Sequence, residues 1–251
     1  MKQHEAVIRV MEENGGFATL GHLYQHVLKM PGCEWQTKTP FASMRRIVQN
    51  EKFFFKIKPG LWALKSHRHL LPDEMLATRE KTPRQIDFTH SYYQGLLVQL
   101  GNLRSYETFI PPQDKNKVFL GNERLGNLAS RTDMYPFTYD TIVGRAQAID
   151  VVWFNPRKLP AFVFEVEHST DMKNSLVKFV ELQDFRTDMI IVSDMSRRRQ
   201  FDATLSLNAF GPIKSFVSFW SYQQLSQLHS KSFELKALQN TMGGTERTQL
   251  K

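Results

Sequence analysis

The sequence has little of what disulfide-bonded, zinc-binding or membrane-spanning proteins need. Its single cysteine, Cys33, excludes a disulfide framework and a cysteine-based zinc cluster, and suits a reducing cytoplasm. No apolar run is long enough to cross a bilayer, so we expect no membrane partner. The first residues, MKQHEAVIRV, lack the apolar core and cleavage site of a secretory signal. With 41% hydrophobic and 23% charged residues, the composition is typical of a globular protein, which we expect to be cytoplasmic.

Positive charge is abundant, and it is concentrated at one end of the chain. The net charge is +8, and residues 1–70 hold 11 of the 33 lysines and arginines but only 5 of the 25 acidic residues. A basic excess in the first quarter of the chain favours a polyanionic partner for that part.

The first 66 residues show the pattern of three short helices and a hairpin. Apolar residues recur at helical spacing in 4–13 and 19–28, and Thr39 with Pro40 is typical of the start of a third helix. The run FFFKIKPGLWAL then predicts two short strands around a Pro-Gly turn. His22, His26 and Cys33 are too few to favour a metal site over ordinary surface histidines.

This pattern resembles the winged helix-turn-helix modules fused to bacterial restriction enzymes, including the closing Pro-Gly-Leu-Trp-Ala-Leu. The resemblance implies a winged-helix DNA-binding domain over residues 1–66, with the third helix in the major groove and the hairpin near phosphates. The candidate DNA contacts are Lys38, Ser43, Arg45, Arg46, Gln49, Lys56 and Lys58. The alternative is a winged helix that binds protein, in which Arg45 and Arg46 are merely solvated.

The rest of the chain predicts a second domain of mixed α and β elements. Residues 67–85 are polar and form a predicted linker, residues 86–240 form the second domain, and residues 241–251 form a flexible tail. Helices are predicted at 87–100, at 172–185 and from Arg197, and strands at 105–110, 147–154, 161–167, 188–193 and 215–220. This order predicts an α/β fold, a three-layer αβα sandwich with a mixed sheet, in which 188–193 is a buried central strand.

Three carboxylates fall on one face of a predicted hairpin. If the turn-like segment 155–160 is centred, Phe154 pairs with Ala161 and Asp150 lies opposite Glu165. Glu167 shares a face with Glu165 because side chains alternate along a strand. Like charges this close require a cation, and an all-oxygen site suits Mg²⁺ or Mn²⁺. The alternative is a solvent-facing strand that carries two ordinary glutamates.

Asp150 followed by Glu165-Val166-Glu167, a helix and an apolar strand resembles the PD-(D/E)XK, or restriction-endonuclease-like, nuclease superfamily. The resemblance covers about residues 87–220, and FEVEHSTDMKNSLVKF looks like one of its branches. It implies that Asp150 and Glu165 are metal ligands. Two positions depart from the pattern, since Ile149 stands where proline is common and Glu167 stands where lysine is usual.

The missing lysine leaves two possibilities open. Glu167 is a further metal ligand or the general base, or the lysine has moved to the following helix, where Lys178 is the first candidate and Lys173 the second. Gln94 on the first helix of this domain is a candidate for supporting the metal, against the ordinary role of a helix-surface glutamine. His168 points to the opposite face by alternation, which favours a structural or substrate-positioning role, and Ser169 and Thr170 are predicted to cap the next helix.

The favoured function is a Mg²⁺-dependent DNA endonuclease, a type II-like restriction deoxyribonuclease of bacterial restriction or anti-phage defence, with Mn²⁺ able to substitute. Its expected partner is double-stranded DNA, and cleavage of both strands suggests a homodimer. Residues 115–146 form an insertion with candidate base-contacting side chains, Arg124, Arg131, Asp133 and Asp140. The alternatives are a non-catalytic DNA-binding regulator with a degenerate nuclease fold and a winged-helix adaptor for another protein.

Overall fold

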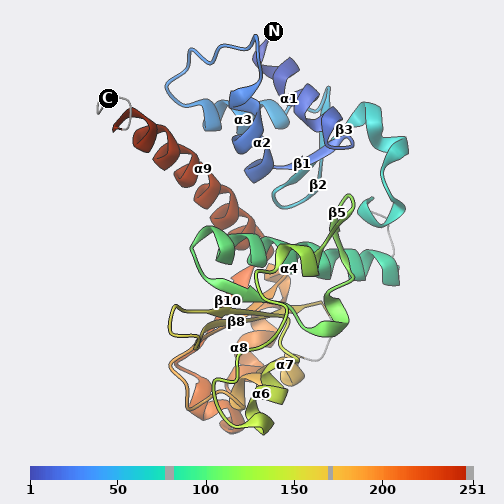
Figure 1. The fold of residues 1–251 in the computed structure, drawn as a ribbon. Helices are drawn as coiled ribbons and strands as arrows, with labels where there is room; N and C mark the ends of the chain where they lie inside the picture. Colours follow the sequence, from blue (N-terminus) through green and yellow to red (C-terminus); the bar gives the residue numbers. More distant parts are fainter. Residues whose placement is uncertain (77–81, 169–171, 247–251) are drawn as a thin grey trace. The chain divides into compact units, whose positions relative to one another are not determined.

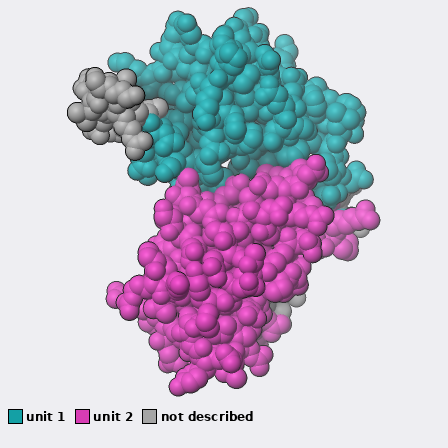
Figure 2. Space-filling view, viewed as in Figure 1, with its two compact units in different colours: residues 1–82, 226–251 teal, residues 83–225 magenta. Residues whose placement is uncertain are grey.

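The computed structural model describes residues 1–76, 82–168 and 172–246. The chain forms two compact units, which Figure 2 colours separately. Unit 1 comprises Met1–Thr82 and Ser226–Lys251, and unit 2 comprises Pro83–Leu225. These units differ from the predicted segments, because residues 226–240 pack with the N-terminal part of the chain.

Unit 1 contains the three predicted helices and the predicted hairpin (Figure 1). Its elements are α1 (Gln3–Glu13), β1 (Phe17–Thr19), α2 (Leu20–His26), α3 (Pro40–Val48), β2 (Phe54–Lys58) and β3 (Leu61–Leu64). The strands form an antiparallel sheet in the order β1-β3-β2. The short strand β1 was not expected from the sequence. Thr39 does precede α3 with Pro40 at its first position, but the Thr39 side chain makes no capping hydrogen bond.

The first part of the predicted linker, residues 67–76, belongs to unit 1, and its last residues, 83–85, begin the helix Pro83–Leu103 of unit 2. Two 3₁₀ helices, Lys65–Leu70 and Asp73–Met75, follow β3. Leu71 and Met75 are buried, and such apolar anchors hold a segment that polar composition alone suggests is free. Residues 77–81 lie outside the described part of the chain.

Helix α9 (Tyr222–Glu246) completes unit 1 from the far end of the sequence. Ser226 Oγ donates to the Pro59 carbonyl at 2.8 Å, and Gly21 leaves room for the rings of His229 and Phe233. The helix continues through 241–246, inside the segment predicted as a flexible tail, because a helix already formed extends at little cost. Residues 247–251 are not described.

Unit 2 is built on a five-stranded mixed sheet in the order β10-β9-β8-β7-β4. The strands are β4 (Glu107–Phe109), β7 (Val151–Phe154), β8 (Pro160–Glu167), β9 (Asp188–Ser193) and β10 (Val217–Ser221). The pairs β10–β9 and β9–β8 are parallel, and β8–β7 and β7–β4 are antiparallel. The predictions of a mixed sheet and of a buried strand at 188–193 are therefore confirmed, but the central strand is β8 and not β9.

Helices cover both faces of this sheet. Side chains of α6 (Asp140–Ala146), α7 (Met172–Val180) and α8 (Arg198–Leu205) share one core with Val152, Val163 and Ile191. The long helix α4 (Pro83–Leu103) packs against β4, β7 and β8. Helix α7 ends at Val180, five residues earlier than predicted, and turns carry Leu182 into the core. No helix in the described ranges is long and apolar enough to span a membrane.

The insertion before the β7–β8 hairpin has structure of its own. It contains β5 (Val118–Leu120), β6 (Glu123–Arg124) and α5 (Leu125–Leu128), followed by α6. The Arg131 guanidinium lies 4.0 Å from the centre of the Tyr135 ring. Phe119 of β5 is buried against α4 at Gly95, where any Cβ would overlap the ring.

The contact at Gly95 predicts a sharp response to one methyl group. Gly95→Ala is expected to destabilise the protein by about 1–3 kcal/mol, because the Phe119 ring must move in a packed core. Gly144 in α6 faces open space, so Gly144→Ala is the matched control and should be neutral or stabilising by about 0.5–1 kcal/mol. Urea unfolding measures both values, and equal effects of the two variants would contradict the packing.

Unit 1 is expected to be acid-sensitive through His229. This side chain is buried beside Phe233, and burial lowers the pKa of His229 from 6.5 to about 3. Only the unfolded chain gains a proton between these values, so stability present above pH 6.5 is lost as the pH falls, by about 1.4 kcal/mol per unit. We expect the melting temperature of His229→Leu to fall less between pH 7 and pH 4.5 than that of the wild type. The exposed control His69→Leu should retain the wild-type pH dependence, and an unchanged dependence in His229→Leu would contradict this account.

Candidate active site

The β7–β8 hairpin brings Asp150 and Glu165 together. Val151 pairs with Phe164 and Trp153 with Phe162, which carries Asp150, just before β7, to the level of Glu165. The Asp150 backbone N–H donates to Glu165 Oε1 at 3.3 Å. The predicted pair Phe154–Ala161 is wrong, because a register shift pairs Phe154 with Pro160.

The shift arises in the turn that joins the strands. Asn155 Oδ1 accepts the backbone N–H groups of Arg157 and Leu159 at 2.9 and 3.2 Å. Lys158 adopts φ 64°, in the left-handed region, which allows this tight closure. The irregularity stays at the turn and leaves the carboxylate end of the hairpin in the expected register.

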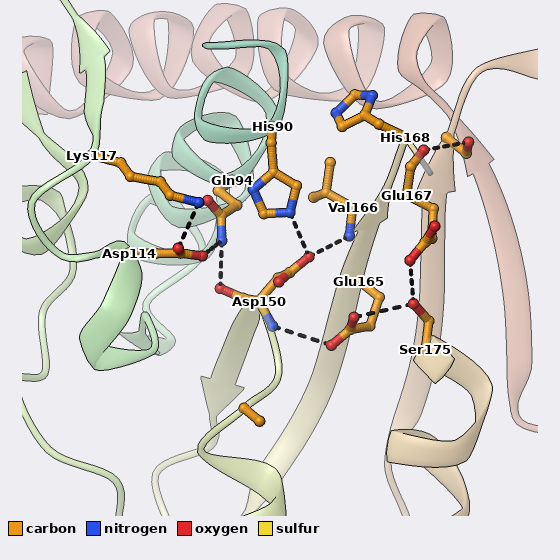
Figure 3. Close-up of polar contacts among 12 residues, drawn as sticks. His90, Gln94, Asp114, Lys117, Asp150, Glu165, Val166, Glu167, His168 and Ser175 are labelled. Carbon is orange, nitrogen blue, oxygen red and sulfur yellow. Dashed lines mark hydrogen bonds and ion pairs between the residues drawn. The ribbon is translucent and has the colours of Figure 1, made fainter. Parts of the chain in front are cut away.

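Glu165 and Glu167 face α7, where one serine contacts both. Ser175 Oγ lies 3.2 Å from Glu165 Oε2 and 2.5 Å from Glu167 Oε1 (Figure 3). A hydroxyl has one proton and can donate to only one carboxylate at a time. Ser175 was not predicted from the sequence, although a serine within the apolar stripe of Met172, Leu176 and Phe179 is a usable signal.

Lys178, one turn further along α7, reaches Glu165. Its Nζ donates to both oxygens of Glu165 at 2.9 Å and to the Ala148 carbonyl at 2.9 Å. Lys173 on the same helix is exposed, so α7 brings one of the two candidate lysines into the cluster. The predicted capping residues Ser169 and Thr170 lie outside the described residues.

Helix α4 holds Asp150 from the other side (Figure 3). His90 Nε2 lies 3.0 Å from Asp150 Oδ2, and the Val166 backbone N–H donates to the same oxygen at 2.8 Å. Gln94 is fully buried, and its Nε2 donates to Asp114 Oδ2 at 2.7 Å and to the Asp150 carbonyl at 3.3 Å. Sequence reasoning missed His90, although it lies one helical turn before Gln94 and so on the same face.

Glu167 sits at the outer end of the cluster. Arg197 Nη1 is 3.5 Å from Glu167 Oε2, and the Glu167 carbonyl accepts Ser193 Oγ at 2.7 Å and the Tyr222 hydroxyl at 3.0 Å. The Tyr222 hydroxyl also lies 2.6 Å from His168 Nδ1. These contacts fix the end of β8 and give His168 a partner away from the three carboxylates.

The carboxylates differ in how easily they ionise. Burial and the charge of Asp150 raise the pKa of Glu165 well above its usual value, although Lys178 opposes this. Burial also disfavours the charged form of Asp150, but His90 and the Val166 N–H outweigh it and lower the pKa of Asp150. The Lys178 ammonium loses hydration on burial, yet Glu165 raises its pKa. The cluster therefore needs compensating positive charge, which Lys178 and His90 supply.

The fit of the cluster to a divalent cation rests on two carboxylates. In the described ranges, no three His, Cys, Asp or Glu side chains form a group that could hold a metal ion, and this includes His22, His26 and Cys33. Asp150 and Glu165 are adjacent and buried, whereas Glu167 turns toward Ser175 and Arg197. Burial and the neighbouring charge of Asp150 raise the pKa of Glu165. Two adjacent buried carboxylates of this kind have the chemistry of a hard-cation site.

The candidate DNA contacts of unit 1 separate into accessible and engaged side chains. Lys38, Arg46, Gln49 and Lys56 are exposed. Arg45 is held by two groups of its own unit, the Tyr24 hydroxyl at 3.0 Å and Glu234 of α9 at 2.8 Å. Ser43 Oγ donates to the Thr39 carbonyl at 3.3 Å, and Lys58 is half-buried.

Comparison with known proteins relates this chain to a restriction enzyme. The chain is 24% identical over 151 residues to the type II restriction enzyme NmeDI of Neisseria meningitidis serogroup C, an alignment that covers 56% of this chain and 42% of that protein. The chain thus matches less than half of the relative's length. No solved structure matches. The family model for the type II restriction enzyme NmeDI C-terminal domain matches residues 70–243, well over half of the sequence, and the chain therefore belongs to that family.

Proposed function

We propose that this protein is a divalent-metal-dependent DNA endonuclease of the restriction type, with a PD-(D/E)XK active site in unit 2. The observation that carries the proposal is the position of Lys178, whose Nζ lies 2.9 Å from both oxygens of Glu165. Glu165 in turn neighbours Asp150 across the hairpin. Two acidic groups and a lysine thus meet on adjacent elements, although the lysine comes from α7 and not from β8.

In this proposal each side chain has a separate task. Asp150 and Glu165 would hold Mg²⁺ or Mn²⁺, which when bound lowers the pKa of water and offsets the charge of the scissile phosphate. Lys178 keeps its proton, because Glu165 raises its pKa, and can stabilise negative charge that develops on the phosphate. Glu167, held near Ser175 and Arg197, shapes the outer wall of the cluster.

The non-catalytic alternative loses its main support. It rested on glutamate at the position where the superfamily usually has lysine. Lys178 supplies an ammonium group to Glu165 from the next helix, so Glu167 alone does not indicate a degenerate site. DNA binding without cleavage remains the outcome that would favour a regulator.

We also propose that unit 1 is a winged-helix DNA-binding module. The order of helices and the antiparallel hairpin support this assignment, as does the charge of the first 70 residues. The accessible candidates are Arg46 on α3, Gln49 directly after α3, and Lys56 on β2. Arg45 is a structural contact in this proposal, since Tyr24 and Glu234 occupy its guanidinium.

The cleavage test uses methylated and unmethylated plasmid DNA with Mg²⁺, with Mn²⁺ and with EDTA. Wild-type protein should cut in either metal and not in EDTA. Asp150→Asn and Glu165→Gln should abolish cutting while DNA binding persists, and Lys178→Met should slow it by at least about 10²-fold. Glu167→Gln should be milder than Lys178→Met.

The control is Lys173→Met, which removes an exposed lysine from the same helix and should cut like wild type. If Lys173→Met were as slow as Lys178→Met, or if Glu167→Gln were the more severe change, the charge-stabilising role of Lys178 would be wrong. Wild-type protein that binds every substrate and cuts none in either metal would overturn the nuclease assignment.

The DNA-binding test measures affinity against salt concentration on random duplex DNA in EDTA. Arg46→Ala combined with Lys56→Ala should weaken binding and lower the slope of log Kd against log salt by about 2. The slope falls because the variant contacts fewer phosphates, so that fewer counterions are released when it binds DNA. Arg45→Ala is the control and should reduce thermal stability with little change in slope. An equal loss of slope in Arg45→Ala would place that residue at the DNA.

A further inference from the structure

His90 stands out because its polar contact within the described residues is directed at Asp150. Nε2 lies 3.0 Å from Asp150 Oδ2, whereas Nδ1 is buried and has no hydrogen-bond partner there. The ring also meets His168 edge to face, with centroids 5.9 Å apart, which restricts its orientation. The His90 ring is thus partly buried, and its hydrogen bond within the described residues is directed at Asp150 alone.

The consequence for Asp150 follows from counting donors. Oδ2 receives two N–H groups, from His90 on α4 and from Val166 on β8. A carboxylate oxygen has two lone pairs, so Oδ2 is saturated by these donors. The oxygen that remains to bind a cation is Oδ1, and the plane of the carboxylate is set by groups on two different elements.

The backbone of Asp150 is held by the same helix. Gln94, one turn after His90, donates to the Asp150 carbonyl and to Asp114, which is itself paired with Lys117 at 2.8 Å. Figure 3 shows both side chains of α4 directed at Asp150. Helix α4 therefore fixes the main chain through Gln94 and the side chain through His90.

We infer that His90 is a positioning residue that orients Asp150 so that Oδ1 faces a divalent cation. The inference rests on the proposed metal-dependent function and deepens it by assigning a role to a residue on α4. Hydrogen bonds to a ligating carboxylate act on metal affinity, and their loss typically weakens it by about 10–100-fold. His90 does not contact the metal or the DNA in this role.

The experiment is calorimetric titration of metal-free, DNA-free protein with Mn²⁺. His90→Ala should raise the Kd for Mn²⁺ by about 10-fold or more. His90→Gln, which retains an N–H donor near the place of Nε2, should recover most of that loss. The control is Asp87→Ala, which replaces an exposed residue one turn earlier on α4 and should bind Mn²⁺ with the wild-type Kd.

A second readout separates positioning from stability. Cleavage measured against Mg²⁺ concentration should show a higher half-saturating concentration for His90→Ala but a rate at saturating metal closer to wild type, because Asp150 is still present. A wild-type Kd for Mn²⁺ in His90→Ala, or no recovery in His90→Gln, would overturn the inference and leave the nuclease proposal intact. Absence of Mn²⁺ binding and of cleavage in the wild type would overturn both.

Discussion

Burial of three carboxylates at one end of the β7–β8 hairpin is the constraint on which the rest of unit 2 depends. Glu165 is 3% exposed and Asp150 8%, and a charge that leaves water at this depth needs a partner. Each carboxylate has a different one: His90 and the Val166 N–H for Asp150, Lys178 for Glu165, and Ser175 with Arg197 for Glu167. Apolar residues of similar volume would fill the same space with a smaller desolvation penalty. The buried acidic cluster therefore indicates a function other than stabilisation of the fold.

The partners come from elements that are distant in the sequence, so the cluster exists only when unit 2 is folded. His90 and Gln94 belong to α4, Lys178 to α7 and Arg197 to the turn after β9. Helix α4, which carries His90 and Gln94, is itself packed against β5, whose Phe119 ring lies at Gly95. A site assembled in this way has little freedom to rearrange, since each side chain is anchored by the core of its own element.

The sequence predicted the parts of this arrangement that depend on local pattern. Alternation along β8 placed Glu165 and Glu167 on one face, and the contact of Ser175 with both confirms it. The hairpin count placed Asp150 beside Glu165 correctly, although Phe154 was paired wrongly because the turn closes through Asn155 and a left-handed Lys158. His90, by contrast, meets Asp150 over a separation of sixty residues, and helical spacing shows which face it shares but not what that face packs against.

Long-range packing also changes the meaning of the basic residues in unit 1. Arg45 and Arg46 are adjacent in sequence and looked equivalent as candidate DNA contacts. Arg45 donates to Glu234 of α9, 189 residues away in the sequence, at 2.8 Å, whereas Arg46 is exposed. The guanidinium of Arg45 would have to give up a carboxylate and a phenol to reach a phosphate, whereas Arg46 gives up only water. Some basic side chains of this region, such as Arg45, are thus engaged in contacts within the protein. The exposed ones, such as Arg46, are those available to a polyanion.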